Sequence, residues 1–356
     1  MFLEEDTMSL NYKCPGCGAP IKFNPKIGGF KCEYCFNKYS EEELTSYLER
    51  SAAKKNSAQE SLSSGSGNGI KQYVCGNCGA EVAAGETSSA SFCYYCHSPV
   101  ILNDRLSGEF KPDKVIPFKI DKKEAVSKFK EWVRGKRYVP SDFTSQSTQD
   151  KITGIYLPYW QADIEADINY HAVGVSVSSW TSGDKEYTKT DKYDINRSGK
   201  IDINNVKELA FTKIDKNLIN GISIYDEDEQ IDFSAGYLAG FFAEQYDIKK
   251  EEAEPVFTEK AKTTAINAIR DSADYSSIED EKDESVYSIK DCRYVLLPSW
   301  ILTYLYKGKT YVFAVNGQTG KSFGELPLDK TRLALFSALV SAAAAGLLIL
   351  GGLFIW

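Results

Sequence analysis

The fold of this chain starts from two short stretches, Tyr12-Lys13-Cys14-Pro15-Gly16-Cys17-Gly18-Ala19 and Cys32-Glu33-Tyr34-Cys35. Each stretch contains a C-x-x-C pair, and fourteen residues separate Cys17 from Cys32. A C-x-x-C pair forms a tight turn whose sulfurs converge on one metal ion, and a β-hairpin brings two such turns together. This spacing is close to that of known zinc sites. It predicts a zinc ribbon over residues 11–39 with one structural Zn²⁺.

The same pattern occurs a second time between Cys75 and Cys96, with fourteen residues again between the inner cysteines. Eight residues of the first stretch match eight of the second at a constant offset: Tyr12, Cys14, Cys17, Gly18, Ala19, Cys32, Tyr34 and Cys35 match Tyr73, Cys75, Cys78, Gly79, Ala80, Cys93, Tyr95 and Cys96. The repeat predicts a second zinc ribbon over residues 73–103. The expected ligands are Cys14, Cys17, Cys32 and Cys35 for one Zn²⁺ and Cys75, Cys78, Cys93 and Cys96 for the other.

Cysteine pairs have three other uses that bear on this sequence. A rubredoxin-like iron centre uses the same four thiolates, and a thioredoxin-type C-x-x-C needs one pair in a βαβ context. Cys93 to His97 matches the C-x-x-C-H pattern of haem attachment, but haem would leave Cys75 and Cys78 without a role. We therefore favour two structural zinc ions.

The overall charge disfavours nucleic acid as a partner. The net charge is -8, the sequence pI is about 5.1, and acidic residues outnumber Lys and Arg by eight to six over residues 1–50. Binding to nucleic acid by phosphate neutralisation normally needs a basic face. The start of the chain lacks the features of a secretory leader, and Met8 is an alternative start to Met1. Paired cysteines in a chain of this length are typical of metal binding in a reducing cytosol.

A short helix and a linker are expected between the two ribbons, over residues 40–72. Ser40 and Glu43 form a capping-box pattern at the start of the helix. The following stretch is rich in serine and glycine, a composition that is typical of a flexible linker.

Residues 108–330 alternate between helical and strand patterns and predict a mixed α+β domain. Asp121 and Glu124 form a second capping-box pattern. The expected strands are Val115–Ile120, Gly154–Val177, Tyr294–Thr303 and Lys309–Val315, and the expected helices are Asp121–Val133, Asp232–Tyr246 and Glu251–Ile269, with an acidic loop over Ile278–Ser285. The motif Leu157-Pro158-Tyr159-Trp160 recurs as Leu297-Pro298-Ser299-Trp300, which suggests an internal duplication.

No catalytic set emerges from the residues. His97 and His171 are the only histidines, and Cys292 is expected to be a buried small side chain. Residues 315–322 resemble a phosphate-binding loop but lack its first glycine and a following helix pattern, so a β-turn is expected there. The sequence therefore predicts neither an enzyme nor a small-molecule substrate.

The last segment, residues 333–356, contains no charged residue. A helix of this length is about 36 Å long at about 1.5 Å per residue, against about 30 Å for a hydrocarbon core. Lys330 and Arg332 precede it. The pattern predicts a single transmembrane tail anchor in contact with the lipid bilayer, with the rest of the chain on the cytoplasmic face of the cell membrane. A buried core helix is the alternative.

Taken together, these motifs resemble an uncharacterised bacterial family labelled TFIIB-type zinc-ribbon-containing proteins. The resemblance rests on both ribbons, Val115–Lys119, the two Leu-Pro-x-Trp motifs and Asn316–Lys321. It implies partners among SPFH or flotillin-like and phage-shock-type proteins. The function expected from all these features is a non-enzymatic, membrane-anchored zinc-ribbon adaptor that recruits protein partners. The alternative is a transcription-linked zinc-ribbon protein that binds RNA polymerase or DNA.

Overall fold

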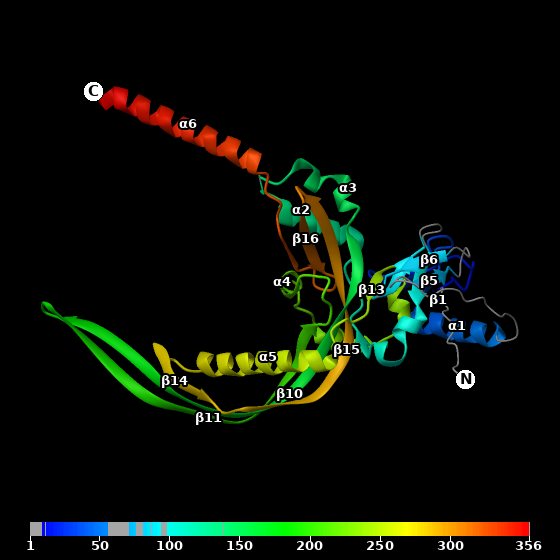
Figure 1. Cartoon of the computed structure of the whole chain (residues 1–356), viewed down its shortest axis with the longest axis horizontal. Coiled ribbons are helices and arrows are strands. Elements are labelled where there is room, and N and C mark those ends of the chain that lie inside the picture. Colours follow the sequence, from blue (N-terminus) through cyan, green and yellow to red (C-terminus); the bar gives the residue numbers. More distant parts are fainter. Residues whose placement is uncertain are drawn as a thin grey trace.

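The computed structural model describes residues 9–10, 12–55, 71–75, 81–85, 87–93, 98–136 and 138–355. Over these residues a mixed sheet of 12 strands forms the body, and two small sheets, β2-β3-β4 and β5-β6, belong to the ribbon segments (Figure 1). The helices are α1 (Glu41–Lys55), α2 (Lys122–Val133), α3 (Gln146–Gln149), α4 (Lys216–Asn220), α5 (Lys250–Asp271) and α6 (Lys330–Ile355).

The first eight strands along the chain are short. They are β1 (Ser9–Leu10), β2 (Lys22–Asn24), β3 (Gly29–Lys31), β4 (Lys38–Tyr39), β5 (Lys71–Val74), β6 (Glu81–Ala84), β7 (Ser88–Phe92) and β8 (Pro99–Leu102). Three of them, β1, β7 and β8, belong to the 12-stranded sheet. The other strands of the body are β9 (Lys114–Val115), β10 (Thr153–Ser182), β11 (Lys185–Leu209), β12 (Ile231–Asp232), β13 (Phe242–Glu244), β14 (Ser277–Asp283), β15 (Val286–Tyr306), β16 (Lys309–Asn316) and β17 (Ser322–Gly324). The main path through the large sheet is β1-β8-β7-β13-β10-β15-β16-β17.

Strand β10 organises the body because it pairs with β11 on one side and with β14 and β15 on the other. Its alternating residues Ile164, Ala166, Ile168 and Tyr170 are all buried, which confirms the predicted strand pattern. A bulge interrupts both pairings at Asp163. Beyond β14, β10 and β11 continue as a two-stranded hairpin that projects from the body (Figure 1).

The two Leu-Pro-x-Trp motifs lie side by side in the sheet, because Leu157 on β10 pairs with Leu297 on β15. Each tryptophan secures the chain just before a helix. The indole of Trp160 donates to Ile248 O at 2.8 Å, ahead of α5, and the indole of Trp300 donates to Ile120 O at 3.0 Å, ahead of α2. The two helices therefore have equivalent attachments to the central strands.

Apolar side chains cover both faces of the sheet. The larger core contains residues of α2 and α5, such as Phe129 and Phe257, together with Trp160 and Trp300. The second core lies against α4 and contains Leu157, Leu297 and residues from 209 to 225. Leu157 and Trp160 are three residues apart and join opposite cores, as the alternation along a strand requires.

Several local predictions are confirmed. The side chain of Ser40 accepts a hydrogen bond from the Glu43 N–H, and Asp121 and Glu124 form the predicted capping box of α2. The helix over 251–269 is present as α5, and Lys307 and Gly308 join β15 to β16. The turn that follows Asn316 leads into β17, a strand, as expected for a segment that is not a phosphate-binding loop.

Other local predictions were wrong. Residues 232–246 form β12, a short 3-10 helix and β13, because β13 finds partners in β7 and β10. The acidic segment over 278–285 is mostly strand β14, which pairs with β10. The expected strand at 115–120 is limited to β9, and Phe118 beyond it is buried against Tyr156. In each case a long-range contact overrides the local pattern.

The predicted transmembrane tail anchor over 333–356 is corrected. Within the described part of the chain, none of the helices has the length and apolar character needed to cross a membrane. This finding contradicts the predicted single-pass tail anchor and the cell-membrane location that was inferred from it.

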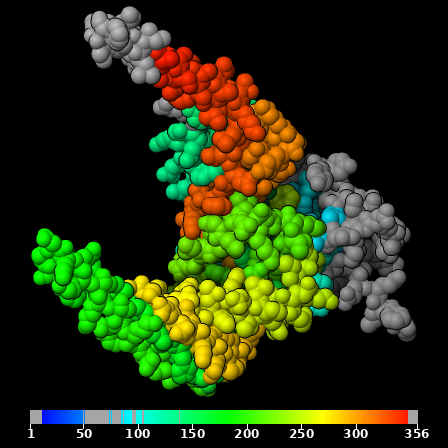
Figure 2. Space-filling model, turned by 60° about the vertical axis from the view of Figure 1, so that its left-hand side comes forward, coloured from blue at the N-terminus to red at the C-terminus, as the bar shows by residue number. Residues whose placement is uncertain are grey.

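Helix α6 is attached to the body through its first turn. The Asp329 carboxylate accepts hydrogen bonds from the Thr331 and Arg332 N–H groups, and the Asp329 N–H donates to Tyr138 O at 2.7 Å. The rings of Tyr138 and Phe336 lie 5.6 Å apart. Beyond this anchor, α6 and the β10–β11 hairpin form two separate projections from the body (Figure 2).

Candidate metal centre

The first ribbon brings its cysteines together through two matching turns. Cys14 and Cys17 belong to the turn before β2, where the Gly18 N–H donates to Cys14 O at 2.8 Å. Cys32 and Cys35 belong to the turn after β3, where the Phe36 N–H donates to Cys32 O at 3.1 Å. The residue after the second cysteine of each pair has a left-handed backbone, with φ of 73° at Gly18 and 60° at Phe36. This conformation turns the backbone back toward the sulfurs.

The four sulfur atoms lie at distances that fit one metal ion. All four are within 4.8 Å of one another. Cys14 Sγ lies 3.5 Å from Cys35 Sγ, and Cys17 Sγ lies 3.6 Å from Cys32 Sγ. A tetrahedral ion with metal–sulfur bonds of about 2.3 Å would place its ligands about 3.8 Å apart. Cys14, Cys17, Cys32 and Cys35 therefore form a group that could hold a metal ion.

Backbone N–H groups and one hydroxyl group stabilise negative charge on the first sulfur of each C-x-x-C pair, Cys14 and Cys32. Burial opposes ionisation of Cys14, but hydrogen bonding with Tyr39 and with the N–H groups of Cys17 and Gly16 lowers its pKa to about 6. Burial also opposes ionisation of Cys32, yet the N–H groups of Cys35 and Tyr34 lower the pKa of this thiol.

The second sulfur of each pair, at Cys17 and Cys35, has a raised pKa instead. An N–H from Asn37 favours the Cys35 thiolate, but burial and the three neighbouring sulfurs raise its pKa to about 12. An N–H from Ala19 likewise favours the Cys17 thiolate, while burial and Cys32 raise its pKa. The cluster thus carries some negative charge, but repulsion between neighbouring thiolates opposes ionisation of the remaining thiols. A central divalent cation removes this repulsion and allows all four thiols to ionise.

The ribbon is packed onto the body, which the sequence did not indicate. Phe23 is buried, and its ring meets that of Tyr237 at 5.3 Å, edge to face. The Phe23 N–H donates to Ala239 O at 2.9 Å. Lys26 at the hairpin turn forms an ion pair of 3.2 Å with Asp121, the N-cap of α2. One face of the ribbon is therefore fixed against the body.

The second set of cysteines is described only in part. Cys75 and Cys93 are buried together with Tyr73, whereas Cys78 and Cys96 lie outside the described residues. The Cys93 N–H donates to Ser98 O at 2.9 Å, and the equivalent bond in the first ribbon joins Cys32 and Asn37 at 2.9 Å. The repeat is thus visible at this turn, and the second metal site stays a prediction.

The second ribbon segment is also joined to the body. Strand β7 pairs with β13, and the Gln245 N–H donates to Thr87 O at 2.7 Å. Glu244 accepts hydrogen bonds from Thr87 and Ser88. Burial raises the pKa of Glu244 despite these bonds. Arg105 donates to Gly85 O and Ser88 O.

The remaining candidate reactive residues do not assemble a catalytic site within the described part of the chain. His97 lies outside that part. His171 is exposed on β10, where its ring nitrogens contact Asn196 and Asn169. Burial raises the pKa of Cys292 to about 11, which suits a packed thiol rather than a nucleophile.

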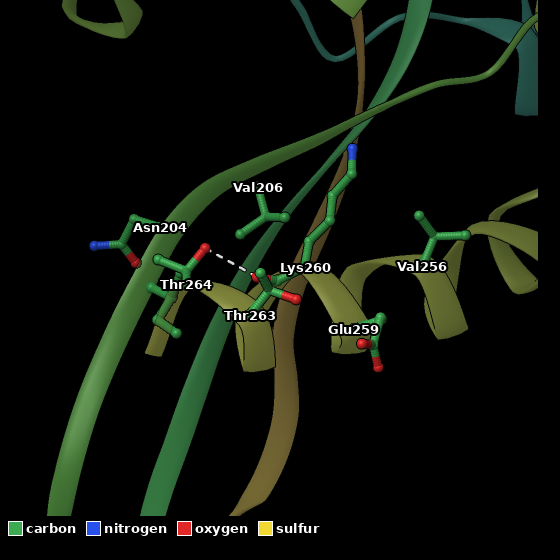
Figure 3. Close-up of a pocket in the computed structure, with 8 residues that line it drawn as sticks. Asn204, Val206, Val256, Glu259, Lys260, Thr263 and Thr264 are labelled. Carbon is green, nitrogen blue, oxygen red and sulfur yellow. Dashed lines mark hydrogen bonds between the residues drawn. The ribbon is translucent and has the colours of Figure 1, made fainter. Parts of the chain in front are cut away.

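A groove of about 510 Å³ lies between β11 and α5 (Figure 3). It is lined by Ile203, Asn204, Val206, Val256, Glu259, Lys260, Thr263 and Thr264. The Lys260 ammonium is already paired with Glu208 at 2.7 Å, and Glu259 contributes the one carboxylate among the lining residues. Glu259 and Lys260 are therefore the ionisable side chains among the lining residues.

Comparison with known proteins gives one informative relative. The chain is 31% identical over 329 residues to the uncharacterized protein YdjG of Bacillus subtilis (strain 168), a match that covers 92% of this chain and 93% of the relative. No protein-family model matches the chain. No solved structure matches it either.

Proposed function

The chain belongs to the family of the uncharacterized Bacillus subtilis protein YdjG, and we propose that it is a non-enzymatic zinc-ribbon adaptor that recruits partner proteins. The observation that carries this proposal is the cluster of Cys14, Cys17, Cys32 and Cys35, whose sulfurs all lie within 4.8 Å. Four protein ligands complete a tetrahedral site and leave no position for a substrate or water. Such a site supports structure rather than catalysis.

Zinc is the metal that we propose for this site. Four thiolates are a soft donor set, and Zn²⁺ accepts tetrahedral coordination by sulfur without a redox change. The sheet β2-β3-β4 consists of three strands of only two or three residues, so bound metal would contribute much of the free energy that folds it. The same reasoning extends to the set that contains Cys75 and Cys93.

The position of the ribbon supports an adaptor role. Phe23 and Lys26 hold the ribbon against the body, so the surface of the second turn is presented in a fixed orientation. Tyr34 and Phe36 in that turn are 72% and 69% exposed. Exposed aromatic side chains on a rigid support are typical anchors in protein interfaces. SPFH or flotillin-like and phage-shock-type proteins are the partners that the family resemblance implies.

Co-purification from cells tests the proposal. Tagged full-length chain is compared with Cys14→Ser, which removes one ligand, and with Cys292→Ser, which changes a cysteine outside the cluster. We expect a defined set of proteins to accompany the wild-type and Cys292→Ser chains and to be lost from the Cys14→Ser chain. An identical set of proteins with all three chains would refute the adaptor role of the ribbon.

A further inference from the structure

A row of three lysines crosses the first ribbon, with Lys38 exposed and Lys22 and Lys31 half-buried. In the register of β2, β3 and β4, Lys22 is directly opposite Lys31, and Lys31 is directly opposite Lys38. Directly opposite residues of an antiparallel pair project from the same face, with Cβ atoms about 5 Å apart. The neighbouring row of Phe23, Phe30 and Tyr39 belongs to the other face, which packs on the body.

No carboxylate of a described residue forms an ion pair with any of these three lysines. Like charges placed directly opposite each other destabilise a sheet. The stem of Lys22 lies over Gly240 of the body, where an added Cβ would come within 3.2 Å of Lys22 Cβ. The stem of Lys22 is therefore packed against the body, and the three like charges repel one another, an arrangement that favours an anionic partner.

Phe36 lies beside this row and presents an exposed aromatic side chain from a strained, left-handed backbone. The equivalent position of the first turn is Gly18, which adopts a left-handed backbone without a steric penalty. Phe36 adopts a φ of 60° and is 69% exposed, so packing within the chain does not explain the choice of phenylalanine. Lys31 Nζ lies 6.0 Å from the centre of its ring. Strained residues of this kind cluster at functional surfaces.

We propose that the basic–aromatic face, defined as Lys22, Lys31, Lys38 and Phe36, binds an acidic segment of a partner protein that also carries an apolar side chain. This inference rests on the proposed adaptor function and names the chemistry of its partner. Carboxylates of the segment would pair with the lysine row, and its apolar side chain would cover Phe36. Charge complementarity of this type gives specificity and speeds association.

An acidic protein segment fits this face better than nucleic acid does. Three lysines can neutralise only about three phosphates, and long-range repulsion opposes a polyanion because the chain has a net charge of -8. A short acidic segment of a protein needs few charge contacts and meets less long-range repulsion than a polyanion.

Fluorescence anisotropy on the full-length, zinc-loaded chain tests the inference. The probe is a labelled peptide of Asp-Glu-Phe-Gly repeats, compared with the same peptide containing Asn-Gln in place of Asp-Glu and with oligo(dT). We expect only the acidic peptide to bind, with an affinity that falls as salt rises. Lys31→Glu combined with Lys38→Glu should weaken binding about tenfold or more. Lys185→Glu combined with Lys189→Glu, the same total charge change in the distant hairpin, should leave binding within about twofold.

Phe36→Gly separates a binding role from a structural one. Glycine suits the left-handed backbone, so we expect this variant to keep its zinc and to melt at the same or a higher temperature, while it binds the peptide more weakly. Lys31→Gln should likewise raise the melting temperature because it removes the like-charge contact with its neighbours.

Several results would overturn the inference. One is equal binding of the acidic and neutral peptides, and another is tighter binding of oligo(dT). A third is loss of zinc from the lysine variants with peptide binding unchanged, which would mean that the lysines only balance the thiolate charge. If partners are lost from Cys14→Ser but retained by the lysine variants in co-purification, the adaptor proposal stands and this inference fails.

Discussion

The ring of Phe23 on the first ribbon meets the ring of Tyr237 on the body edge to face, with centroids 5.3 Å apart. Phe23 also contacts Phe30 across the ribbon hairpin at 5.7 Å. One side chain therefore links the metal-binding unit both to its own sheet and to the larger fold. This link makes the orientation of the metal centre a property of the whole chain rather than of a separate module.

Phe23→Ala tests how strongly the ribbon is attached. We expect the free energy of unfolding to fall by about 3 kcal/mol, because the substitution removes a buried ring and leaves a cavity. Urea unfolding provides the measurement. Ile27→Ala, in the exposed hairpin turn of the same ribbon, is the control and should change stability by less than about 0.5 kcal/mol. Equal effects of the two substitutions would mean that the ribbon is not packed as described.

Removal of metal should loosen the first ribbon and spare the body. A strong chelator is expected to release zinc and to make residues 12–39 sensitive to protease, because the small sheet then lacks its main source of stability. The 12-stranded sheet should keep its circular dichroism signal. Elemental analysis should show one zinc fewer per chain in Cys14→Ser than in Cys292→Ser. Unchanged zinc content in Cys14→Ser would contradict the assigned ligand set.

Trp160→Phe and Trp300→Phe test the paired attachment of α5 and α2. Each variant keeps an aromatic ring but leaves a main-chain carbonyl, at Ile248 or Ile120, without its indole donor. We expect each to lower the free energy of unfolding by about 1–2 kcal/mol. Trp180→Phe is the matched control because Trp180 is 50% exposed near the hairpin tip. A neutral result at both buried positions would show that the two indole bonds do not support the helices.

Glu208 is expected to make stability depend on pH. Its side chain is 8% exposed and lies 2.7 Å from both Lys216 and Lys260. Burial opposes its ionisation, but the two lysines outweigh burial and lower the pKa of Glu208. Because the folded-state pKa is below the unfolded value of about 4.3, the stabilisation is present above that value and is lost as pH falls through the folded pKa.

Glu208→Gln should therefore lower the free energy of unfolding by about 2 kcal/mol at neutral pH, with a smaller difference in acid. Urea unfolding of both chains across this pH range is the measurement. Glu186→Gln at the exposed hairpin tip should behave like the wild type at every pH. A difference between Glu208→Gln and wild type that grows as pH falls would contradict the assigned role of the carboxylate.

Much of the local structure could be predicted because its causes are local. A capping box such as Asp121 with Glu124 needs only four consecutive residues, and the alternation from Ile164 to Tyr170 reports a half-buried strand directly. The segment over 232–246 was predicted as a helix, yet β13 within it gains partners from β7 and β10. Such partners are distant in sequence and invisible to a local pattern.

The candidate metal site divides in the same way. The spacing of Cys14, Cys17, Cys32 and Cys35 was enough to predict that their four sulfurs come together, because two tight turns at the ends of one hairpin direct their sulfurs to a common point. The basic–aromatic face could not be foreseen, because the five lysines of residues 11–39 are scattered along the sequence and their spacing does not show which of them share a face. Only the register of three strands places Lys22, Lys31 and Lys38 side by side.

The sequence by itself therefore determined the ligand set, the helix caps and the central strands, because each depends on residues close together in the chain. The tertiary structure decided that the ribbon packs on the body through Phe23, that two tryptophans hold two helices, and that three separated lysines form one row. These features depend on which strands pair and in what register. Pairing is settled by the total apolar surface that the fold buries, a sum over the chain that no single motif contains.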